Sequence, residues 1–299
     1  MPPIMALDPP KGSEYLVGSI QKYLIERFPE SIHYCPLEEN YRSAEDIVDY
    51  AKTIGYSQNL RASNPKTALH LLSAIQSPPS GSTAASLPWS PLWNHIIDAN
   101  KKVLTLIHDD DLSSQGNEFE AKIVAVLVYL LRQTVSSELD GRGQANHVSP
   151  TSEEFWKKCV GIVTPHRAQR AMVIRELQTL FPGDQPNLID SAVDTVEKFQ
   201  GGERHTIIIT FAVGDTDVIL GEEAFLMQLE RTNVAISRAI AKSIVIMPAT
   251  LAGHVPHDKK VIETAHAIKG YVDEFCDKEI IGDISFNNNL RKAKLRYHS

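Results

Sequence analysis

Residues 194–211 read DTVEKFQGGERHTIIITF. The end of this stretch, 206–211, is a short β-branched run of the kind that forms a buried strand. The polar segment before it contains Gly201 and Gly202, where the absence of a Cβ lets the backbone approach a ligand closely. We expect this loop at the carboxyl edge of a parallel sheet, the edge at which open α/β sheets bind ligands. Glu203 would then accept hydrogen bonds from a sugar hydroxyl, and the alternative from spacing alone is a tight turn with a solvated Glu203.

Around this stretch, short β-branched runs alternate with amphipathic helical windows. This alternation indicates an α/β fold with a mainly parallel sheet and helices on both faces. The pattern predicts strands at 68–72, 102–107, 160–164, 188–195, 206–211 and 243–247, and helices at 15–28, 44–53, 118–131, 167–180, 222–238 and 259–275.

Two polar stretches interrupt the alternation and predict surface insertions near 77–91 and 136–152. We expect one domain over 1–256, followed by a C-terminal helix and a basic tail over 257–299. The tail contains RKAKLR at 291–296, for which a frayed terminus is the first interpretation and contact with nucleic acid the alternative.

Composition narrows the class of protein. The formal net charge of −7 excludes a generally basic nucleic-acid binder, so any contact with nucleic acid must be local. The three cysteines, Cys35, Cys159 and Cys276, are far apart and predict neither a disulfide framework nor a zinc site, which favours a reducing compartment. No apolar run is long enough to span a bilayer and the N-terminus does not resemble a signal peptide, so we expect no membrane partner and a cytoplasmic protein, or a nuclear one in a eukaryote.

A second polar segment, 231–239 (RTNVAISRA), precedes the strand at 243–247. On a helix, Phe225, Leu229 and Ile236 share one apolar face, and Arg238 lies about 200° from Ile236 at roughly 100° per residue. Arg238 therefore points toward a cleft or toward solvent. A merely solvated arginine is the alternative.

A third segment, LEENYRS at 37–43, directly precedes the helix at 44–53. Ser43 can serve as its N-cap, which places Arg42 just outside the helix start. Pairing of Arg42 with Glu38 or Glu39 on the surface is the alternative.

A fourth segment, GIVTPHRAQ at 161–169, is a buried strand that breaks into a helix. The first turn of a helix exposes unpaired amides, which form a natural phosphate site. Thr164 and His166 lie beside this turn as hydrogen-bond donors. A strand-to-helix turn without special meaning is an equally good interpretation.

These segments, in this order, resemble the C-terminal, AAA-type half of superfamily 1 DNA and RNA helicases. The resemblance is closest to the branch whose fifth motif reads T-V-x-x-F-Q-G-x-E. It runs from residue 1 to about 250, because MPPI at 1–4 resembles the end of the family's third motif and NEFEA at 117–121 resembles its N-x-x-E-A segment. It implies a RecA-like three-layer sandwich for 1–256.

The resemblance also implies roles for single residues. Arg42 and Arg238 match arginines that reach across an interdomain cleft to the γ-phosphate of ATP. Glu203 matches an acid that binds the nucleotide ribose, and Gln200, Gly201 and Gly202 lie in the same nucleotide-binding loop. Residues that match contacts to the nucleic-acid backbone are Thr164, His166 and Thr195.

The sequence contains no G-x-x-x-x-G-K-[ST] phosphate loop and no acidic motif for Mg²⁺. In the family both belong to a first RecA-like domain, so we expect ATP and Mg²⁺ to be shared with such a domain in cis or in trans. The expected protein is the second motor domain of a helicase on single-stranded DNA or RNA, as a fragment or split subunit that is inactive alone. The alternative is a non-catalytic remnant that binds nucleic acid or a protein.

An unrelated small-molecule enzyme is disfavoured, because the sequence shows no dinucleotide fingerprint, nucleophile elbow or metal-ligand spacing, and its 11 histidines are scattered.

Overall fold

The computed structural model describes residues 20–30, 37–63, 69–71, 87–138, 150–196, 199 and 202–298. The chain divides into two compact units, Met1–Glu38 and Glu39–Ser299. In the first unit, helix α1 (Ile20–Arg27) confirms the part of the predicted helix that is described.

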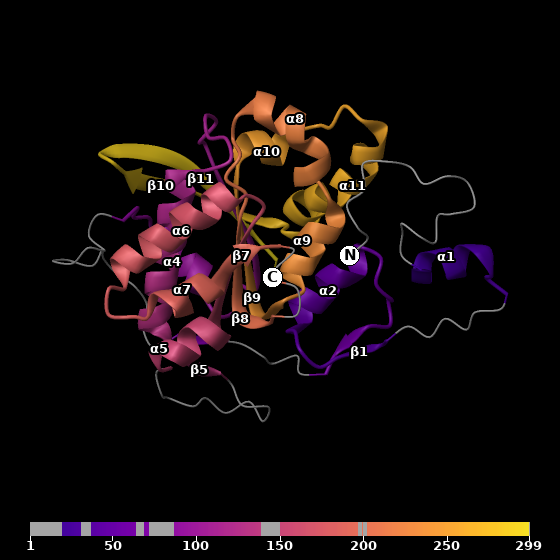
Figure 1. Ribbon diagram of the computed structural model, residues 1–299, viewed down its shortest axis with the longest axis horizontal. Helices are drawn as coiled ribbons and strands as arrows, with labels where there is room; N and C mark the ends of the chain where they lie inside the picture. The colour runs from indigo at the N-terminus through magenta and orange to yellow at the C-terminus, as the bar shows by residue number, and fades with distance from the viewer. Residues whose placement is uncertain are drawn as a thin grey trace. The chain divides into compact units, whose positions relative to one another are not determined.

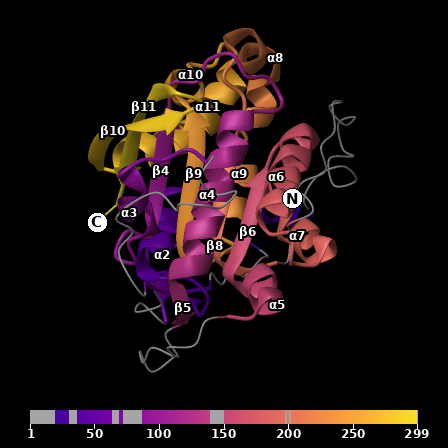
Figure 2. The ribbon, with the colours of Figure 1, turned by 90° about the vertical axis from the view of Figure 1, so that its left-hand side faces the viewer.

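The second unit is built on a seven-stranded sheet with the order β10-β11-β4-β9-β8-β6-β7, of which Figure 2 labels the strands from β10 to β6 and Figure 1 labels β7. Strands β4, β9, β8, β6 and β7 run parallel, and β10 and β11 are antiparallel additions at one side. This sheet confirms the mainly parallel arrangement that the alternating pattern predicts. The bounds are β4 (Val103–His108), β6 (Val160–Thr164), β7 (Val193–Thr195), β8 (Arg204–Thr210), β9 (Ala239–Pro248), β10 (Lys278–Phe286) and β11 (Asn289–Tyr297).

Two short pairings lie outside this sheet, β1 (Glu39–Asn40) with β2 (Arg61–Ala62) and β3 (Leu69–Leu71) with β5 (Val135–Glu138). The helices are α2 (Glu45–Thr53), α3 (Leu92–Ile97), α4 (Glu118–Thr134), α5 (Ser152–Glu154), α6 (Arg167–Leu180), α7 (Pro186–Ala192), α8 (Thr216–Leu226), α9 (Leu229–Ile236), α10 (Ala249–Gly253) and α11 (Lys259–Lys269), with π-helical turns at Phe155–Cys159 and Gly270–Phe275.

Alternate residues along each central strand face two separate hydrophobic cores, as the pleat of a strand requires. In β9, Ile244 and Ile246 belong to the core under α3, α4, α6 and α7, whereas Val245 and Met247 belong to the core under α2, α8, α9 and α11. Figure 1 shows these two helical layers on either side of the sheet. The molecule therefore has the three-layer organisation that the helicase resemblance implies.

One predicted strand is mostly helical. The segment 188–195 is not one strand, because α7 occupies most of it and only Val193–Thr195 pair with β6. Pro186 at the first helical position favours this helix, and Ile189 and Ala192 bury one of its faces.

The predicted helix at 222–238 is two helices, α8 and α9. Asp215 caps the start of α8 by accepting hydrogen bonds from the amides of Asp217 and Val218 at 2.9 and 3.1 Å. The first helix therefore begins earlier than its apolar spacing suggests, and the chain turns at Met227 and Gln228 before the second.

The prediction of a frayed C-terminal tail is wrong. Asn287 and Asn288 adopt positive φ angles of 48° and 61°, the geometry of a two-residue hairpin turn, and they join β10 to β11. Strand β11 pairs with β4 and buries Ala293 and Leu295. Lys292, Lys294 and Arg296 alternate with these two apolar residues and therefore lie on the other face of the strand, whereas Arg291 shares their face. The domain boundary expected at 256 stays a prediction, and the insertions expected near 77–91 and 136–152 fall largely outside the described residues.

Candidate functional site

The loop between β7 and β8 crosses from one edge of the sheet to the other. Thr195 ends β7 in register with Thr164, the last residue of β6. Glu203 precedes Arg204, which pairs with Ala239 at the amino ends of β8 and β9. Because parallel strands need a crossover connection, Thr195 before the loop lies at the carboxyl edge and Glu203 at its end lies at the amino edge. The expectation that Glu203 lies at the carboxyl edge is therefore wrong.

At the amino edge, three of the predicted site residues come together. Arg42 Nε donates a hydrogen bond to Glu203 Oε2 at 2.6 Å, and Arg42 Nη1 donates to the carbonyl oxygen of Ser237 at 3.3 Å. Arg238 is the next residue along the chain, and its main-chain oxygen accepts from Arg204 N at 3.1 Å. We call Arg42, Glu203 and Arg238 the amino-edge cluster.

Arg42 is held in place by its own short segment. The side-chain oxygen of Asn40 accepts hydrogen bonds from the amides of Arg42 and Ser43, both at 2.8 Å. Ser43 Oγ then donates to the carbonyl oxygen of Ala239 at 2.9 Å, which fixes the segment to the start of β9. The expectation that Ser43 caps α2 is wrong, since the N-cap residue is Ala44 and makes no side-chain hydrogen bond.

Arg238 lies half-buried beside the ion pair. Burial lowers the pKa of its guanidinium, the positive charge of Arg42 lowers it further, and the carboxylate of Glu203 acts in the opposite direction. These influences place all three charges within electrostatic reach of one another. Among the described residues, Arg238 Nε is buried and has no hydrogen-bond partner. The cluster thus presents two guanidinium groups, and that of Arg238 has a nitrogen available for a further hydrogen bond.

Phe199 anchors the loop that carries Glu203. Its ring packs on Gly161 of β6, where an added Cβ would lie 2.5 Å from Phe199 Cζ and 2.9 Å from Arg204 Cγ. The guanidinium of Arg204 stacks over the same ring at 5.4 Å from its centre. Gly202 N donates to the carbonyl oxygen of Phe199 at 3.2 Å. Gln200 and Gly201 lie outside the described residues.

At the carboxyl edge, the other three predicted residues are neighbours. Thr164 and Thr195 are register partners in adjacent strands, and His166 immediately precedes α6. We call Thr164, His166 and Thr195 the carboxyl-edge group. All three are buried, and Thr164 Oγ1 has no hydrogen-bond partner in the described part of the chain.

His166 is oriented by α8. Its Nε2 lies 3.1 Å from a carboxylate oxygen of Glu222, and its ring lies 5.4 Å from that of Phe225. The imidazole is thus fixed at the first turn of α6, where main-chain amides point outward.

A family model described as an AAA domain matches residues 19–249. The chain belongs to this family. Together with the sheet order, the match confirms the RecA-like fold and the membership of the superfamily 1 helicases that the motifs predict.

Curated relatives agree with this assignment. The probable helicase senataxin of Homo sapiens is 30% identical over 264 residues, which cover 88% of this chain and 8% of that protein. A DNA replication ATP-dependent helicase/nuclease of Schizosaccharomyces pombe is 27% identical over 229 residues, or 76% of this chain and 14% of that protein. An uncharacterized ATP-dependent helicase of Methanocaldococcus jannaschii is 25% identical over 234 residues, or 78% of this chain and 29% of that protein. The chain therefore spans only a small part of each of these relatives.

Sequence reasoning missed a buried polar network of this AAA domain at the carboxyl edge. Glu120 accepts hydrogen bonds from Thr210 Oγ1 and, at 3.0 Å, from the amide of Ala212, and its other oxygen lies 2.9 Å from His108 Nε2. Gln169 Nε2 extends the network by donating to Thr210 Oγ1 at 3.0 Å. The sequence does contain a signal for this network. Each of two buried strands ends in a polar residue, His108 or Thr210, and the N-x-x-E-A segment supplies the acid Glu120.

Among the helices of the described residues, none combines the length and the apolar character needed to cross a membrane.

Proposed function

We propose that this AAA domain is the second motor domain of an ATP-dependent helicase of superfamily 1. In this proposal Arg42 and Arg238 act as arginine fingers on the γ-phosphate, and Glu203 binds the ribose, with Gln200, Gly201 and Gly202 in the same loop. Thr164, His166 and Thr195 contact the backbone of single-stranded DNA or RNA. The names of the relatives support both ATP use and helicase activity.

The convergence of the amino-edge cluster carries this proposal. Arg42 comes from a segment far from the other two residues in sequence, yet its guanidinium meets Glu203 at 2.6 Å and lies within electrostatic reach of Arg238. Two converging guanidinium groups suit a transferring phosphoryl group, whose negative charge spreads over three oxygens in the transition state. Such an arginine is worth roughly 10³–10⁵ in rate where it has been measured, or ~4–7 kcal/mol.

The ion pair between Arg42 and Glu203 has to rearrange when a nucleotide binds. Both side chains are substantially exposed, at 38% and 54%. Exposed pairs of this kind are worth about 0–1 kcal/mol, because water solvates both charges and salt screens them. A triphosphate and a ribose hydroxyl can therefore replace the two partners at small cost. In this view the ion pair keeps the two side chains in place until the nucleotide arrives.

The carboxyl-edge group supports the nucleic-acid part of the proposal. A buried hydroxyl without a partner is costly, and a backbone phosphate oxygen would satisfy Thr164 Oγ1 once the residues that cover this fully buried side chain move aside. The first turn of α6 adds main-chain amides, which favour an anion. Contacts of this kind carry no base sequence information, so they serve a motor that moves along any sequence.

The residues present fit part of an ATP site. Two guanidinium groups and one carboxylate suit phosphates and a ribose, whereas the phosphate loop and the Mg²⁺ ligands would come from a first RecA-like domain in cis or in trans. This chain without such a domain is expected to lack ATPase activity. A cytoplasmic location, or a nuclear one in a eukaryote, stays a prediction.

The test is nucleic-acid-stimulated ATP hydrolysis by this chain combined with a first RecA-like domain, on one polypeptide or as two chains. Arg42→Ala and Arg238→Ala are each expected to reduce kcat by roughly 10³-fold or more. The control is Arg175→Ala, because Arg175 on α6 is 66% exposed and pairs only weakly with its neighbour Glu176.

Three results would overturn the proposal: full turnover in both variants, an equal loss in the control, or ATPase activity of the isolated chain that Arg238→Ala abolishes. Nucleic-acid binding by the combined protein without any ATP hydrolysis would instead establish the non-catalytic alternative.

A further inference from the structure

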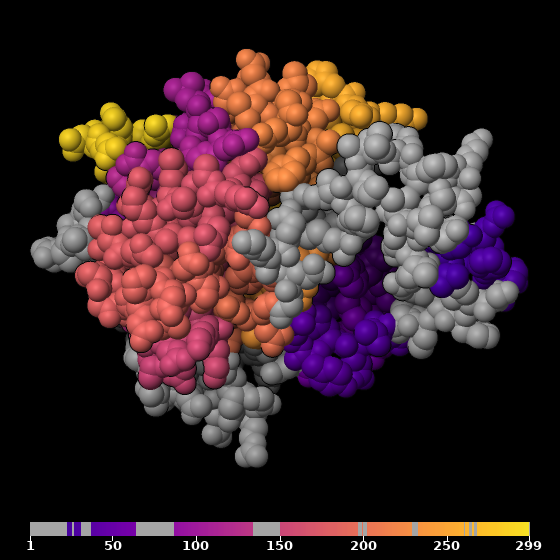
Figure 3. Space-filling view, viewed as in Figure 1, coloured from indigo at the N-terminus to yellow at the C-terminus, as the bar shows by residue number. Residues whose placement is uncertain are grey.

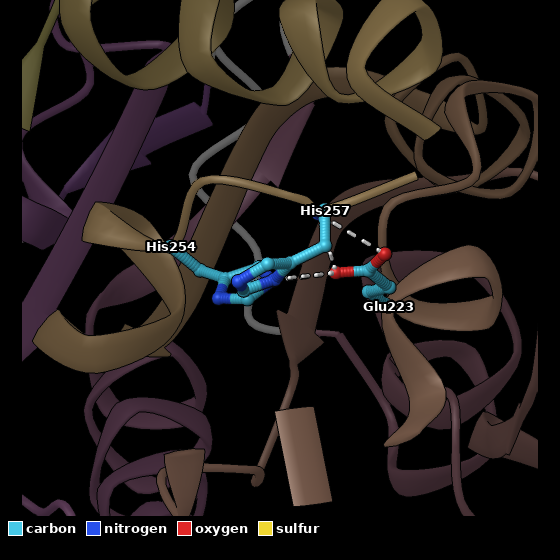
Figure 4. Close-up of side chains that lie close together, drawn as sticks. All are labelled: Glu223, His254 and His257. Atoms are coloured by element: carbon cyan, nitrogen blue, oxygen red, sulfur yellow. Dashed lines mark hydrogen bonds and ion pairs between the residues drawn. The ribbon is translucent and has the colours of Figure 1, made fainter. Parts of the chain in front are cut away.

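Two histidines of one short segment meet a glutamate from an earlier helix beyond the carboxyl ends of β8 and β9 (Figure 4). Glu223 lies on α8, and His254 and His257 lie in the segment between α10 and α11. His254 Nε2 is 3.0 Å from Glu223 Oε2, and His257 Nδ1 is 3.9 Å from the same oxygen. One ligand atom from each residue lies within 4.8 Å of the other two.

These distances suit a single metal ion. A tetrahedral Zn²⁺ binds nitrogen and oxygen ligands at about 2.0–2.2 Å, which puts neighbouring ligand atoms about 3.3–3.5 Å apart. The two separations from Glu223 Oε2 fall on either side of that value. The chemistry also fits, since two imidazoles and one carboxylate form an established ligand set for zinc, with the fourth position left for water or another ligand.

The carboxylate is already oriented by main-chain donors. The amide of Asp258 donates to Glu223 Oε1 at 3.1 Å, and the amide of His257 reaches both oxygens at 3.2–3.3 Å. Hydrogen bonds that hold a ligand from behind are typical of protein metal sites and raise their affinity.

The two histidines differ in exposure in a way that leaves a path for an ion. The side chains of Glu223 and His254 are 10% and 12% exposed, whereas that of His257 is 76% exposed. Figure 3 shows that α8 (orange) reaches the surface at the top of the view. An ion could therefore approach from solvent on the side of His257 and meet two preformed ligands.

We propose that Glu223, His254 and His257 bind one Zn²⁺ ion. Glu223 Oε2, His254 Nε2 and His257 Nδ1 are the ligand atoms, and the fourth position is open to solvent. On binding, the hydrogen that His254 Nε2 now donates to Glu223 moves to Nδ1 of the same ring or is released to water, because a metal-bound nitrogen cannot carry it. The ion joins α8 to the segment that leads into α11. No part of the proposed motor function requires it.

The test is calorimetric titration of the full chain with ZnCl₂, with the zinc content measured after dialysis. We expect saturable binding of a single ion per chain. His257→Ala and His254→Ala should each weaken the affinity by at least tenfold. His257→Ala is the decisive variant, because so exposed a side chain can be removed without loss of the fold. His95→Ala is the control, since His95 lies on α3, outside the cluster.

Excess Mg²⁺ should not displace the zinc, because Mg²⁺ prefers oxygen ligands in an octahedral arrangement. Zinc should also raise the melting temperature of the chain and of the control, but not that of His257→Ala. The proposal is overturned if the chain shows no saturable site, or if His257→Ala and His254→Ala bind zinc as the chain does. Helicase or ATPase activity enters none of these measurements, so a failure of the motor proposal leaves this test intact.

Discussion

The two edges of the sheet use charge in opposite ways. At the amino edge, Arg42 and Glu203 are exposed, and Arg238 Nε has no hydrogen-bond partner in the described part of the chain. At the carboxyl edge, Glu120 is fully buried, accepts hydrogen bonds from Thr210 and from the amide of Ala212, and contacts His108. The difference between these two glutamates lies in their surroundings: the protein encloses Glu120 as a structural hydrogen-bond acceptor, whereas Glu203 faces water and is available for a ligand.

The prediction with the largest expected effect tests this comparison by replacing each of the two glutamates. Glu120→Ala should reduce the free energy of unfolding by ~3–5 kcal/mol, because it leaves buried partners without an acceptor and creates a cavity. Glu203→Ala should change it by less than about 1 kcal/mol, since its ion pair is exposed. Urea unfolding of both variants measures the contrast. Equal losses in the two variants would show that the edges do not differ in this way.

A second prediction concerns Lys242, a buried cation on the amino side of the sheet. Lys242 is 1% exposed and donates to the carbonyl oxygens of Ile96 and Asp98 at 3.0 and 2.7 Å, and also to that of Lys101. Burial lowers the pKa of Lys242 to about 7. Between that value and its ordinary pKa, the unfolded chain binds a proton that the folded chain lacks, so stability rises with pH.

From pH 7 to pH 9 this rise should amount to ~1–3 kcal/mol, and Lys242→Met should remove it. Denaturant unfolding of the two proteins at each pH measures the difference, in which contributions from other titrating groups cancel. An identical pH dependence of both proteins would show that Lys242 keeps its proton throughout.

A third prediction concerns the packing that joins the two edges. Gly161→Ala should cost ~1–3 kcal/mol, because the new methyl group would lie 2.5 Å from Phe199 Cζ and displace the loop that carries Glu203. Gly183→Ala is the matched control, since nothing lies within 4 Å of an added Cβ there. Thermal unfolding of both variants provides the measurement. Equal melting temperatures would contradict the close packing of Phe199 on Gly161.

The smallest effect separates two buried hydroxyls. Thr164 Oγ1 and Thr206 Oγ1 both lack hydrogen-bond partners in the described part of the chain, but only Thr164 ends its strand at the carboxyl edge. Thr164→Val should weaken the binding of single-stranded nucleic acid by about two- to tenfold, the value of one lost hydrogen bond. Thr206→Val should leave the affinity unchanged. Fluorescence anisotropy with a labelled oligonucleotide distinguishes them, and an equal effect would remove Thr164 from the proposed track.

Much of the fold could be predicted from local patterns. The strand at 160–164 and the helix at 167–180 have the predicted bounds, because a continuous apolar run and a clear helical periodicity agree with their tertiary environment. The hairpin of β10 and β11 was missed, although two consecutive asparagines are a known turn signal. Its strands carry many charged residues, and their pairing with β4 is a long-range contact that periodicity does not reveal.

The candidate site, like the fold, could be predicted from the sequence only in part. The motif spacing selected Arg42, Glu203 and Arg238 but placed Glu203 at the wrong edge, because a local sequence does not show where a crossover loop ends. The metal-ligand cluster escaped entirely, since Glu223 is separated from His254 and His257 by β9 and α10.

By itself, the sequence determined the class of fold, the family and the types of side chain available for chemistry, because these follow from periodicity and from the order of short motifs. Only the tertiary structure decided which edge each side chain occupies, which carboxylates are surrounded by protein and which histidines meet. Those properties depend on contacts between residues far apart in the chain, and the packing of the whole domain sets them.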